Sequence, residues 1–301
     1  MLRIERLAEQ LAALGCVVRR EEPMRLHTSF HIGGPAELFC EPSTPEQAAA
    51  ARVLCRASGI RMQVIGNGSN LLVADEGVRG VVLAFGPSFA AITREGDRLL
   101  AQSGATLSQL CRFAQREGLC GLEFAWGIPG SVGGAVFMNA GAYGGEMTGV
   151  VDAVWAVDEQ DTLRMLSHEE AEFGYRTSRF QREEWLIVGA RFRLMPEEPA
   201  AIDARMLEII GKRTAKQPLE FPSAGSTFKR PPGAYAAALI EQCALKGLRV
   251  GDAEVSVKHA GFVVNRGHAT CAEVLALCEK IRAAVREQTG IELEMEVKRM
   301  M

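Results

Sequence analysis

The sequence predicts an α+β protein made of two lobes and a compact C-terminal domain. Helical and strand-like apolar patterns alternate along the whole chain, and strand patterns are concentrated in its middle part. The size fits as well, since 301 residues with 48% apolar and 24% charged side chains suffice for two or three packed domains. The chain contains no internal repeat and no low-complexity tract.

The first lobe is predicted to combine helices with strands. Apolar residues at helical spacing predict a helix that ends near Gly15. The capping-box sequence 44–47, with proline at the first helical position, starts a second helix that ends at Gly59. Strands are expected at 62–65 and 80–85.

The second lobe is predicted to hold a mostly antiparallel sheet and one helix. Thr106 and Gln109 form a capping box that opens the helix, and Gly118 closes it. The segment 195–199, which contains two prolines, reads as a linker. Strands are expected at 90–93, 98–102, 150–157, 162–166 and 185–194.

The C-terminal part is predicted to begin with a helix at 200–217 and a proline-punctuated loop at 218–232. A helix capped by Thr270, with Glu273 at its third position, belongs to its core. Further elements are a helix at 234–245, a strand at 261–265 and a last strand at 291–298. The resulting boundaries are 1–85, 86–198 and 199–301.

Charge and composition argue against several classes of partner. A net charge of -3 and a pI near 6.0 provide no basic field for nucleic acid or an anionic membrane. The N-terminus lacks the basic-then-apolar order of a secretory signal, so we expect a cytoplasmic protein, and we expect a monomer. Eight cysteines without a C-x-x-C pair indicate reduced, partly buried thiols, and no metal site is predicted.

Two glycine-rich loops are the strongest functional signal. One runs from Gly66 to Val73, and the other runs from Gly127 to Gly134 and continues to Gly144. Clustered backbone N–H groups in such loops attract phosphate oxygens. The first loop lacks the third glycine and the following helix of a dinucleotide-binding fold, and neither loop carries the lysine of a Walker loop. Each loop alone could be an ordinary turn, but together they predict one phosphorylated cofactor held twice.

Six ordered motifs between about residues 23 and 298 resemble the UDP-N-acetylenolpyruvoylglucosamine reductase family. The length resembles the shorter class of this family, which lacks an inserted tyrosine-bearing loop. One departure is Arg230, where asparagine is frequent. The motifs are the segment 27–36, the two glycine loops, and the segments 175–180, 222–229, 258–265 and 293–297.

The resemblance implies a two-lobed FAD-binding domain of the vanillyl-alcohol-oxidase (PCMH) type and a C-terminal α/β substrate-binding domain. Residues 1–85 and 86–198 would be the two FAD-binding lobes, and the last strand of 199–301 would return toward the flavin site. FAD would be non-covalent, with NADPH as reductant. The implied FAD-binding residues are Gly66, Asn67, Gly68, Ser69, Asn70, Leu71, Gly127, Pro129, Gly130, Ser131, Gly133, Gly134, Asn139, Ala140 and Gly141.

The resemblance also assigns the chemistry, which is reduction of an enolpyruvyl sugar nucleotide to UDP-N-acetylmuramate for peptidoglycan synthesis. It implies that Arg176 and Glu296 polarise the substrate carboxylate and that Ser226 protonates C2 as general acid. Tyr143, Lys229 and Arg230 are candidates for binding the sugar nucleotide, which is the only partner it implies.

The same residues have plainer interpretations when taken alone. Arg176 would be a surface arginine, Ser226 a turn residue, and Glu296 one of several glutamates on the face of a strand away from the core. Two other functions stay open at this point. One is a flavin oxidase of the same fold, and the other is a non-catalytic protein that binds flavin or a sugar nucleotide.

Overall fold

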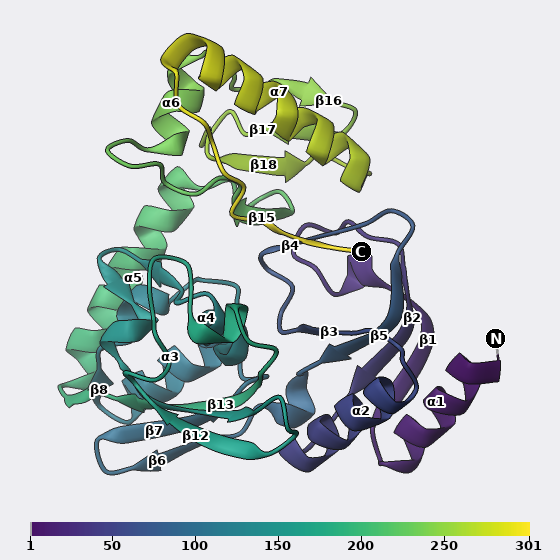
Figure 1. The fold of residues 1–301 in the computed structure, drawn as a ribbon. Coiled ribbons are helices and arrows are strands. Elements are labelled where there is room, and N and C mark those ends of the chain that lie inside the picture. Colours follow the sequence, from purple (N-terminus) through teal and green to yellow (C-terminus); the bar gives the residue numbers. More distant parts are fainter. Residues whose placement is uncertain (1) are drawn as a thin grey trace. The chain divides into compact units, whose positions relative to one another are not determined.

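The computed structural model describes residues 2–301 and divides into two compact units (Figure 1). Unit 1 contains the chain up to Arg20 and the segments Leu38–Asn67 and Gly80–Lys212. Unit 2 contains Glu21–Glu37, Gly68–Arg79 and Arg213–Met301. No helix of the described chain has the length and apolar character needed to cross a membrane.

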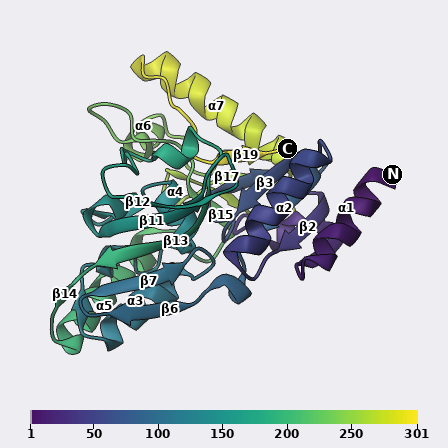
Figure 2. The ribbon, with the colours of Figure 1, turned by 60° about the horizontal axis from the view of Figure 1, so that its bottom comes forward.

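Most of a four-stranded sheet in the order β1-β2-β5-β3 and two helices form the first part of unit 1. Helices α1 (Leu2–Ala13) and α2 (Pro45–Ala57) lie side by side (Figure 2). Their apolar faces join strand residues such as Val81 and Leu83 in one core. The strands are β1 (Val17–Pro23), β2 (Pro35–Glu41), β3 (Met62–Ile65) and β5 (Val78–Ala84).

The predicted start of α2 is correct, although its cap differs in one bond. The Thr44 side chain accepts from the backbone N–H of Gln47, as a capping box requires. The Gln47 side chain, however, accepts from the N–H of Ser43 at 2.6 Å. Two backbone N–H groups are therefore satisfied at the start of the helix. One is that of Gln47, and the other is that of Ser43, the residue before the cap.

The second part of unit 1 contains an antiparallel sheet, as the sequence predicts, and its strands follow the order β12-β11-β13-β7-β6. Its core includes Leu99, Leu107 and Phe192. The strands are β6 (Ile92–Glu95), β7 (Arg98–Gln102), β11 (Val151–Val157), β12 (Leu163–Ser167) and β13 (Leu186–Arg193). The helices are α3 (Leu107–Arg116), α4 (Val132–Phe137) and α5 (Pro199–Lys216), of which α5 belongs to unit 1 up to Lys212.

The segment interpreted as a linker is in fact paired backbone. Strand β14 (Met195–Pro196) pairs antiparallel with β8 (Leu119–Cys120). Proline is tolerated there because β14 and β8 form a two-stranded ladder, in which each strand has an open edge. The prediction of a linker was therefore wrong, because it relied on the proline content of the segment.

Unit 2 has a four-stranded sheet in the order β15-β18-β17-β16. Helix α7 (Cys271–Thr289) lies along this sheet, and α6 (Ala236–Gln242) packs against α7 (Figure 1). The predicted capping box of Thr270 and Glu273 is present at the start of α7. The strands are β15 (Ser223–Ser226), β16 (Arg249–Val250), β17 (Ala253–Val255) and β18 (Phe262–Asn265).

The C-terminal strand differs from its prediction. The segment 291–297 is irregular, apart from one bridge between Met295 and Phe228. The strand is β19 (Lys298–Met300), which pairs in parallel with β4 (Leu71–Val73). Alternation of apolar residues predicted the wrong element because Leu293 and Val297 are buried in the core of unit 2 without regular ladder bonds.

The predicted loop at 218–232 is also partly wrong, because β15 lies inside it and pairs with β18. The composition Ser-Ala-Gly-Ser has low strand propensity, so no local pattern indicates a strand there. Tertiary pairing at the edge of the sheet decides its conformation.

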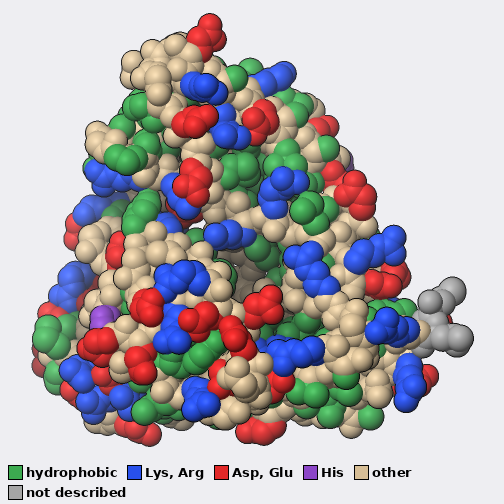
Figure 3. Space-filling view, viewed as in Figure 1, with side chains coloured by type: hydrophobic (Ala, Val, Ile, Leu, Met, Phe, Trp, Pro, Cys, Tyr) green, Lys and Arg blue, Asp and Glu red, His purple; other side chains and the backbone are tan. Residues whose placement is uncertain are grey.

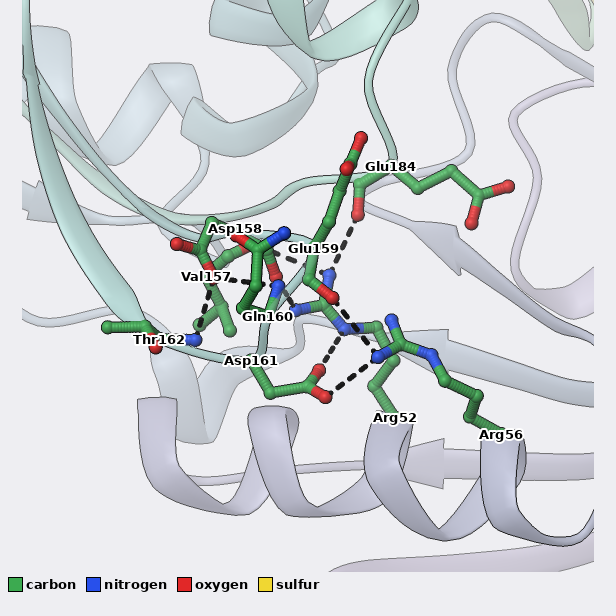
Figure 4. Close-up of polar contacts among 9 residues, drawn as sticks. All are labelled: Arg52, Arg56, Val157, Asp158, Glu159, Gln160, Asp161, Thr162 and Glu184. Atoms are coloured by element: carbon green, nitrogen blue, oxygen red, sulfur yellow. Dashed lines mark hydrogen bonds and ion pairs between the residues drawn. The ribbon is translucent and has the colours of Figure 1, made fainter.

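The buried side chain of Arg52 joins the two parts of unit 1 (Figure 4). From α2 it donates to the carboxylate of Asp161 at 2.7 Å and to the carbonyl oxygens of Asp158 and Glu184. The more exposed Arg56 also reaches the Asp161 carboxylate, at 2.9 Å. The turn between β11 and β12 is thereby fixed to α2.

The remaining surface and the thiols agree with the composition. Acidic and basic side chains are interspersed over the face shown in Figure 3, as the small net charge suggests. All eight cysteines are free, and seven of them are buried. Burial raises the pKa of Cys111 and of Cys278 to about 12, so these thiols stay protonated at neutral pH.

We expect Arg52→Met to lower the free energy of unfolding by about 3–5 kcal/mol, because it removes the buried cation from the Asp161 carboxylate and leaves the carbonyl oxygens of Asp158 and Glu184 without this donor. Arg56→Met is the matched control on the same helix and the same Asp161 carboxylate. Since the Arg56 side chain is 52% exposed, its loss should change stability by less than about 1 kcal/mol. Urea denaturation measures both, and equal effects would contradict this role of Arg52.

Candidate functional site

The two glycine loops meet within unit 1. The Asn67 side-chain amide donates to the carbonyl oxygen of Pro129 at 2.5 Å. A Cβ atom on Gly66 would lie 2.1 Å from Oγ of Ser131, so any side chain at that position would force this hydroxyl to turn away. The ends of two segments far apart in the sequence are therefore held against each other.

Ser131 supplies an unsatisfied polar atom at this junction. Its Oγ is buried and has no hydrogen-bond partner among the described residues, although Ser131 precedes helix α4. The N–H groups of Val132 and Gly133 already bond the carbonyl oxygens of Ala105 and Ser103. A buried hydroxyl without a partner is costly, and a ligand oxygen would remove that cost. The loops thus fit a ligand rich in oxygen acceptors.

The first loop continues into unit 2, where Gly68 is equally constrained. Its φ is +59°, and a Cβ atom there would lie 1.9 Å from the carbonyl oxygen of His27. The N–H of Ser29 donates to the carbonyl oxygen of Gly68. The backbone of the loop is therefore packed against the segment after β1, and Ser69 and Asn70 follow from this fixed point.

The continuation of the second loop contains two unusual backbone conformations. Asn139 is buried with φ +42°, and its side chain bonds Glu146, the carbonyl oxygen of Gly174 and the N–H of Thr148. Tyr143 has φ +50° in the two-residue turn between β9 (Gly141–Ala142) and β10 (Gly145–Glu146). Its exposed ring is thus displayed at the tip of a hairpin.

Arg176 occupies the position in a tight turn that glycine would normally take. Gly174 and Thr177 exchange two backbone hydrogen bonds, and Arg176 between them has φ +55°. The turn is supported by Gln181, whose amide donates to the Arg176 carbonyl oxygen at 2.9 Å. The Arg176 guanidinium donates to the carbonyl oxygen of Gly141. The backbone strain at Arg176 is thus offset by the hydrogen bonds of the turn and of its side chain.

A β-bulge presents Ser226 in unit 2. On β15, Ser223 pairs with Val264 and Ser226 pairs with Phe262, so the register shifts between them. Gly225, inside the shift, has φ +76°. Bulges at sheet edges redirect side chains, and Ser226 is exposed.

The structure brings the backbone of Glu296 to Thr227, the residue after Ser226, in the same unit. The N–H of Glu296 donates to the carbonyl oxygen of Thr227 at 2.9 Å. The carbonyl oxygen of Glu296 accepts from the side-chain amide of Asn70 at 3.2 Å. Sequence reasoning missed this connection, because nothing in the local pattern links residue 70 with residue 296.

Lys229 and Arg230 follow on the same segment of unit 2. The N–H of Lys229 donates to the carbonyl oxygen of Glu294, and its ammonium forms an ion pair with the carboxylate of Glu294. The Arg230 guanidinium lies 4.0 Å from the ring centre of exposed Tyr235. The Tyr235 partner of Arg230 was not predicted either.

The predicted site residues are therefore divided between the units. Unit 1 holds Arg176, Tyr143, Gly66, Asn67 and the predicted residues from Gly127 to Gly141. Unit 2 holds Gly68, Ser69, Asn70, Leu71, Ser226, Lys229, Arg230 and Glu296. Within each unit, residues from distant parts of the sequence are brought together.

One group in the described chain has the composition of a metal site. Ligand atoms of Cys120, Glu123 and Glu197 lie within 4.8 Å of one another. However, the Arg205 guanidinium donates to the carboxylates of Glu123 and Glu197. The hydrogen bonds from Arg205 and then from Cys120 hold the pKa of Glu197 below its usual value. A cation therefore already satisfies these carboxylates.

Comparisons with known proteins agree on both parts of the chain. A family model described as FAD binding domain matches residues 36–166. A model described as UDP-N-acetylenolpyruvoylglucosamine reductase, C-terminal domain, matches residues 217–300.

Individual proteins extend the similarity over nearly the whole chain. A UDP-N-acetylenolpyruvoylglucosamine reductase of Clostridium botulinum is 48% identical over 278 residues, covering 92% of this chain and 90% of its own. The reductase of Heliobacterium modesticaldum is 49% identical, covering 93% and 89%. The crystal structure of the Thermus caldophilus enzyme matches with a TM-score of 0.83 and 37% identity, covering 95% of this chain and 100% of its own.

The turn at Arg176 makes a stability prediction. We expect Arg176→Gly to be about 1 kcal/mol more stable than Arg176→Ala, because both lack the side chain and only alanine is strained at positive φ. At Arg112 inside helix α3 the order should reverse, with alanine about 1 kcal/mol more stable than glycine. Thermal unfolding compares the two pairs, and the same order at both positions would refute the proposed strain.

Proposed function

The chain belongs to the UDP-N-acetylenolpyruvoylglucosamine reductase family, and we propose how its residues divide the work of that reaction. The protein is an FAD-dependent oxidoreductase, a UDP-N-acetylmuramate dehydrogenase. It reduces UDP-N-acetylglucosamine enolpyruvate to UDP-N-acetylmuramate, with NADPH as donor, in peptidoglycan precursor synthesis. The observation that most supports the assignment of roles is the contact between the segments of Ser226 and Glu296.

We propose that the two glycine loops bind FAD non-covalently. Support comes from the orphaned Ser131 hydroxyl and from Gly66, where a side chain would fill the junction. The residues that would hold the cofactor are those of the loops 66–71, 127–134 and 139–141. When bound, FAD carries a hydride from NADPH to the enolpyruvyl group.

Arg176 and Glu296 are proposed to act on the carboxylate of the substrate. Negative charge spreads toward this carboxylate as the hydride arrives at C3, and a fixed cation lowers the energy of that state. The hydrogen bond from the Arg176 guanidinium to the carbonyl oxygen of Gly141 supports this role, since a preorganised guanidinium need not be reoriented during the reaction. Glu296 would also polarise this carboxylate. Its backbone is held in place by the hydrogen bond from the Asn70 side chain to its carbonyl oxygen.

Ser226 is proposed to donate the proton that C2 requires. Its hydroxyl is the exposed donor at the bulge, where the backbone rather than a neighbouring base sets its direction. Deprotonated Ser226 would then regain its proton from solvent or a nearby acid. The proton transfer and the charge stabilisation are thus assigned to different side chains.

Lys229, Arg230 and Tyr143 are proposed to bind the diphosphate and the nucleoside. Lys229 is paired with Glu294, a carboxylate that is 72% exposed. A diphosphate carries more negative charge than one carboxylate and can take its place on the ammonium. The Arg230 guanidinium lies over the ring of Tyr235. This contact orients the guanidinium, whose N–H donors then point to one side.

We also propose that the protein works as a monomer in the cytoplasm and binds no nucleic acid. The small net charge supports the last point, and eight free thiols fit a reducing compartment. Light scattering of the purified protein with and without the substrate tests the monomer.

Ser226→Ala should separate the two half-reactions. We expect reduction of FAD by NADPH to keep its rate, while reoxidation by the enolpyruvyl substrate slows by about a hundredfold or more, because general acids contribute rate factors of this size. Stopped-flow flavin absorbance measures both steps. Ser223→Ala, on the same strand, should leave both steps fast. If reoxidation by Ser226→Ala stays fast, Ser226 is not the proton donor.

Gly66→Ala should weaken FAD binding, because the new methyl group would displace the Ser131 hydroxyl from the junction of the two loops. Gly211→Ala is the control, since nothing lies within 4 Å of a Cβ there and the residue is inside helix α5. That variant should keep its yellow colour and become more stable by up to about 1 kcal/mol. Visible absorbance after gel filtration reports bound flavin. Full FAD occupancy in Gly66→Ala would exclude the proposed loop junction as part of the cofactor site.

A further inference from the structure

We propose that Asn70 is a positioning residue that holds the proposed catalytic Glu296 beside Ser226, in addition to belonging to a cofactor loop. The inference rests on the proposed role of Glu296. It concerns only residues of unit 2, and it starts from a contact that joins positions 70 and 296.

Both peptide groups of Glu296 are fixed by hydrogen bonds. On one side its N–H donates to the carbonyl oxygen of Thr227 at 2.9 Å, and on the other side its carbonyl oxygen accepts from Nδ2 of Asn70 at 3.2 Å. The segment 291–297 has no regular ladder to hold it. These two bonds therefore define where the Cα–Cβ bond of Glu296 points.

Asn70 bonds the same segment a second time, through its backbone. The N–H of Lys298 donates to the carbonyl oxygen of Asn70 at 2.9 Å, and parallel pairing of β19 with β4 begins at Lys298 and Leu71. Val297 between the two contacts is buried. Asn70 thus lies at the point where the first glycine loop passes into β4. At the same point the irregular C-terminal segment passes into β19, the strand that pairs with β4.

The second bond that holds Glu296 goes to the residue after the proposed proton donor, Ser226. Thr227, whose carbonyl oxygen receives the Glu296 N–H, is buried and directly follows Ser226. Its Oγ1 accepts from the N–H of Val263, which anchors it to β18. Asn70 and Thr227 therefore set the distance between the Ser226 and Glu296 backbones from opposite sides.

The side-chain amide of Asn70 is the part of this arrangement that substitution can remove. Backbone bonds survive a change of side chain, whereas Asn70→Ala and Asn70→Asp both lose the donor to the Glu296 carbonyl oxygen. Aspartate keeps the size of asparagine and brings a carboxylate oxygen toward that carbonyl. Small displacements of catalytic groups reduce rates by about a hundredfold per ångström.

The experiment compares Asn70→Ala, Asn70→Asp, Glu296→Gln and the double variant Asn70→Ala/Glu296→Gln at saturating FAD, with FAD affinity measured separately. Stopped-flow absorbance follows flavin reduction by NADPH and reoxidation by the enolpyruvyl substrate. We expect reduction to change by less than about twofold and reoxidation to slow by about tenfold or more. In the Glu296→Gln background, Asn70→Ala should slow reoxidation by less than about twofold, because contacting residues are not additive.

Asn265→Ala is the matched control. This buried asparagine also bonds backbone groups of unit 2, namely the carbonyl oxygen of Phe30 and the N–H groups of Gly267 and Ala269. Its loss should lower the melting temperature while both half-reactions stay within about twofold. Hydrogen exchange of the FAD-free protein provides a readout without turnover: backbone amides 296–300 should exchange faster in Asn70→Ala and not in Asn265→Ala.

Three results would overturn the inference: equal slowing of both half-reactions in the Asn70 variants, unchanged reoxidation, or full multiplication of the two effects in the double variant. If Asn70→Ala does not fold, Asn70→Asp decides the question, since it keeps the side-chain volume. Failure of the proposed function looks different, because Glu296→Gln itself would then reoxidise at the normal rate.

Discussion

The parallel pairing of β19 with β4 is the constraint on which the geometry of unit 2 depends. It attaches the end of the chain to the strand that follows the first glycine loop. The irregular segment before β19 is then stretched between Lys298 and α7, and its apolar residues Leu293 and Val297 are drawn into the core. Glu296 is placed by this attachment, since both of its peptide groups are bonded to residues outside its own segment.

Unit 1 relies on a different constraint, the absence of a side chain at Gly66. Because Gly66 has no Cβ, the buried hydroxyl of Ser131 can approach the backbone of the first loop. The hydrogen bonds from Arg52 to Asp161 and Glu184 join the same two parts of the unit at another point. Strained residues such as Asn139 and Arg176 are tolerated on this rigid frame, where several hydrogen bonds compensate each of them.

Most regular elements could be predicted from the sequence because their signals are local. The strands 62–65 and 98–102 have the predicted bounds, and the caps at Thr106 and Thr270 are present as expected. The errors are β14, β15 and the segment 291–297. In each of these, pairing or burial against a distant segment outweighed a local preference for a linker, a loop or a strand.

The family, the cofactor class and the set of candidate residues follow from the amino-acid sequence alone, because ordered motifs persist whatever the chain contacts. Three other features arise only when the chain folds: Ser131 lies against Gly66, Arg176 adopts a positive φ, and Asn70 bonds the backbone of Glu296. These facts depend on backbone geometry and on contacts between positions up to 226 residues apart. No local pattern encodes such a contact, since the hydrogen bond exists only after both segments have folded.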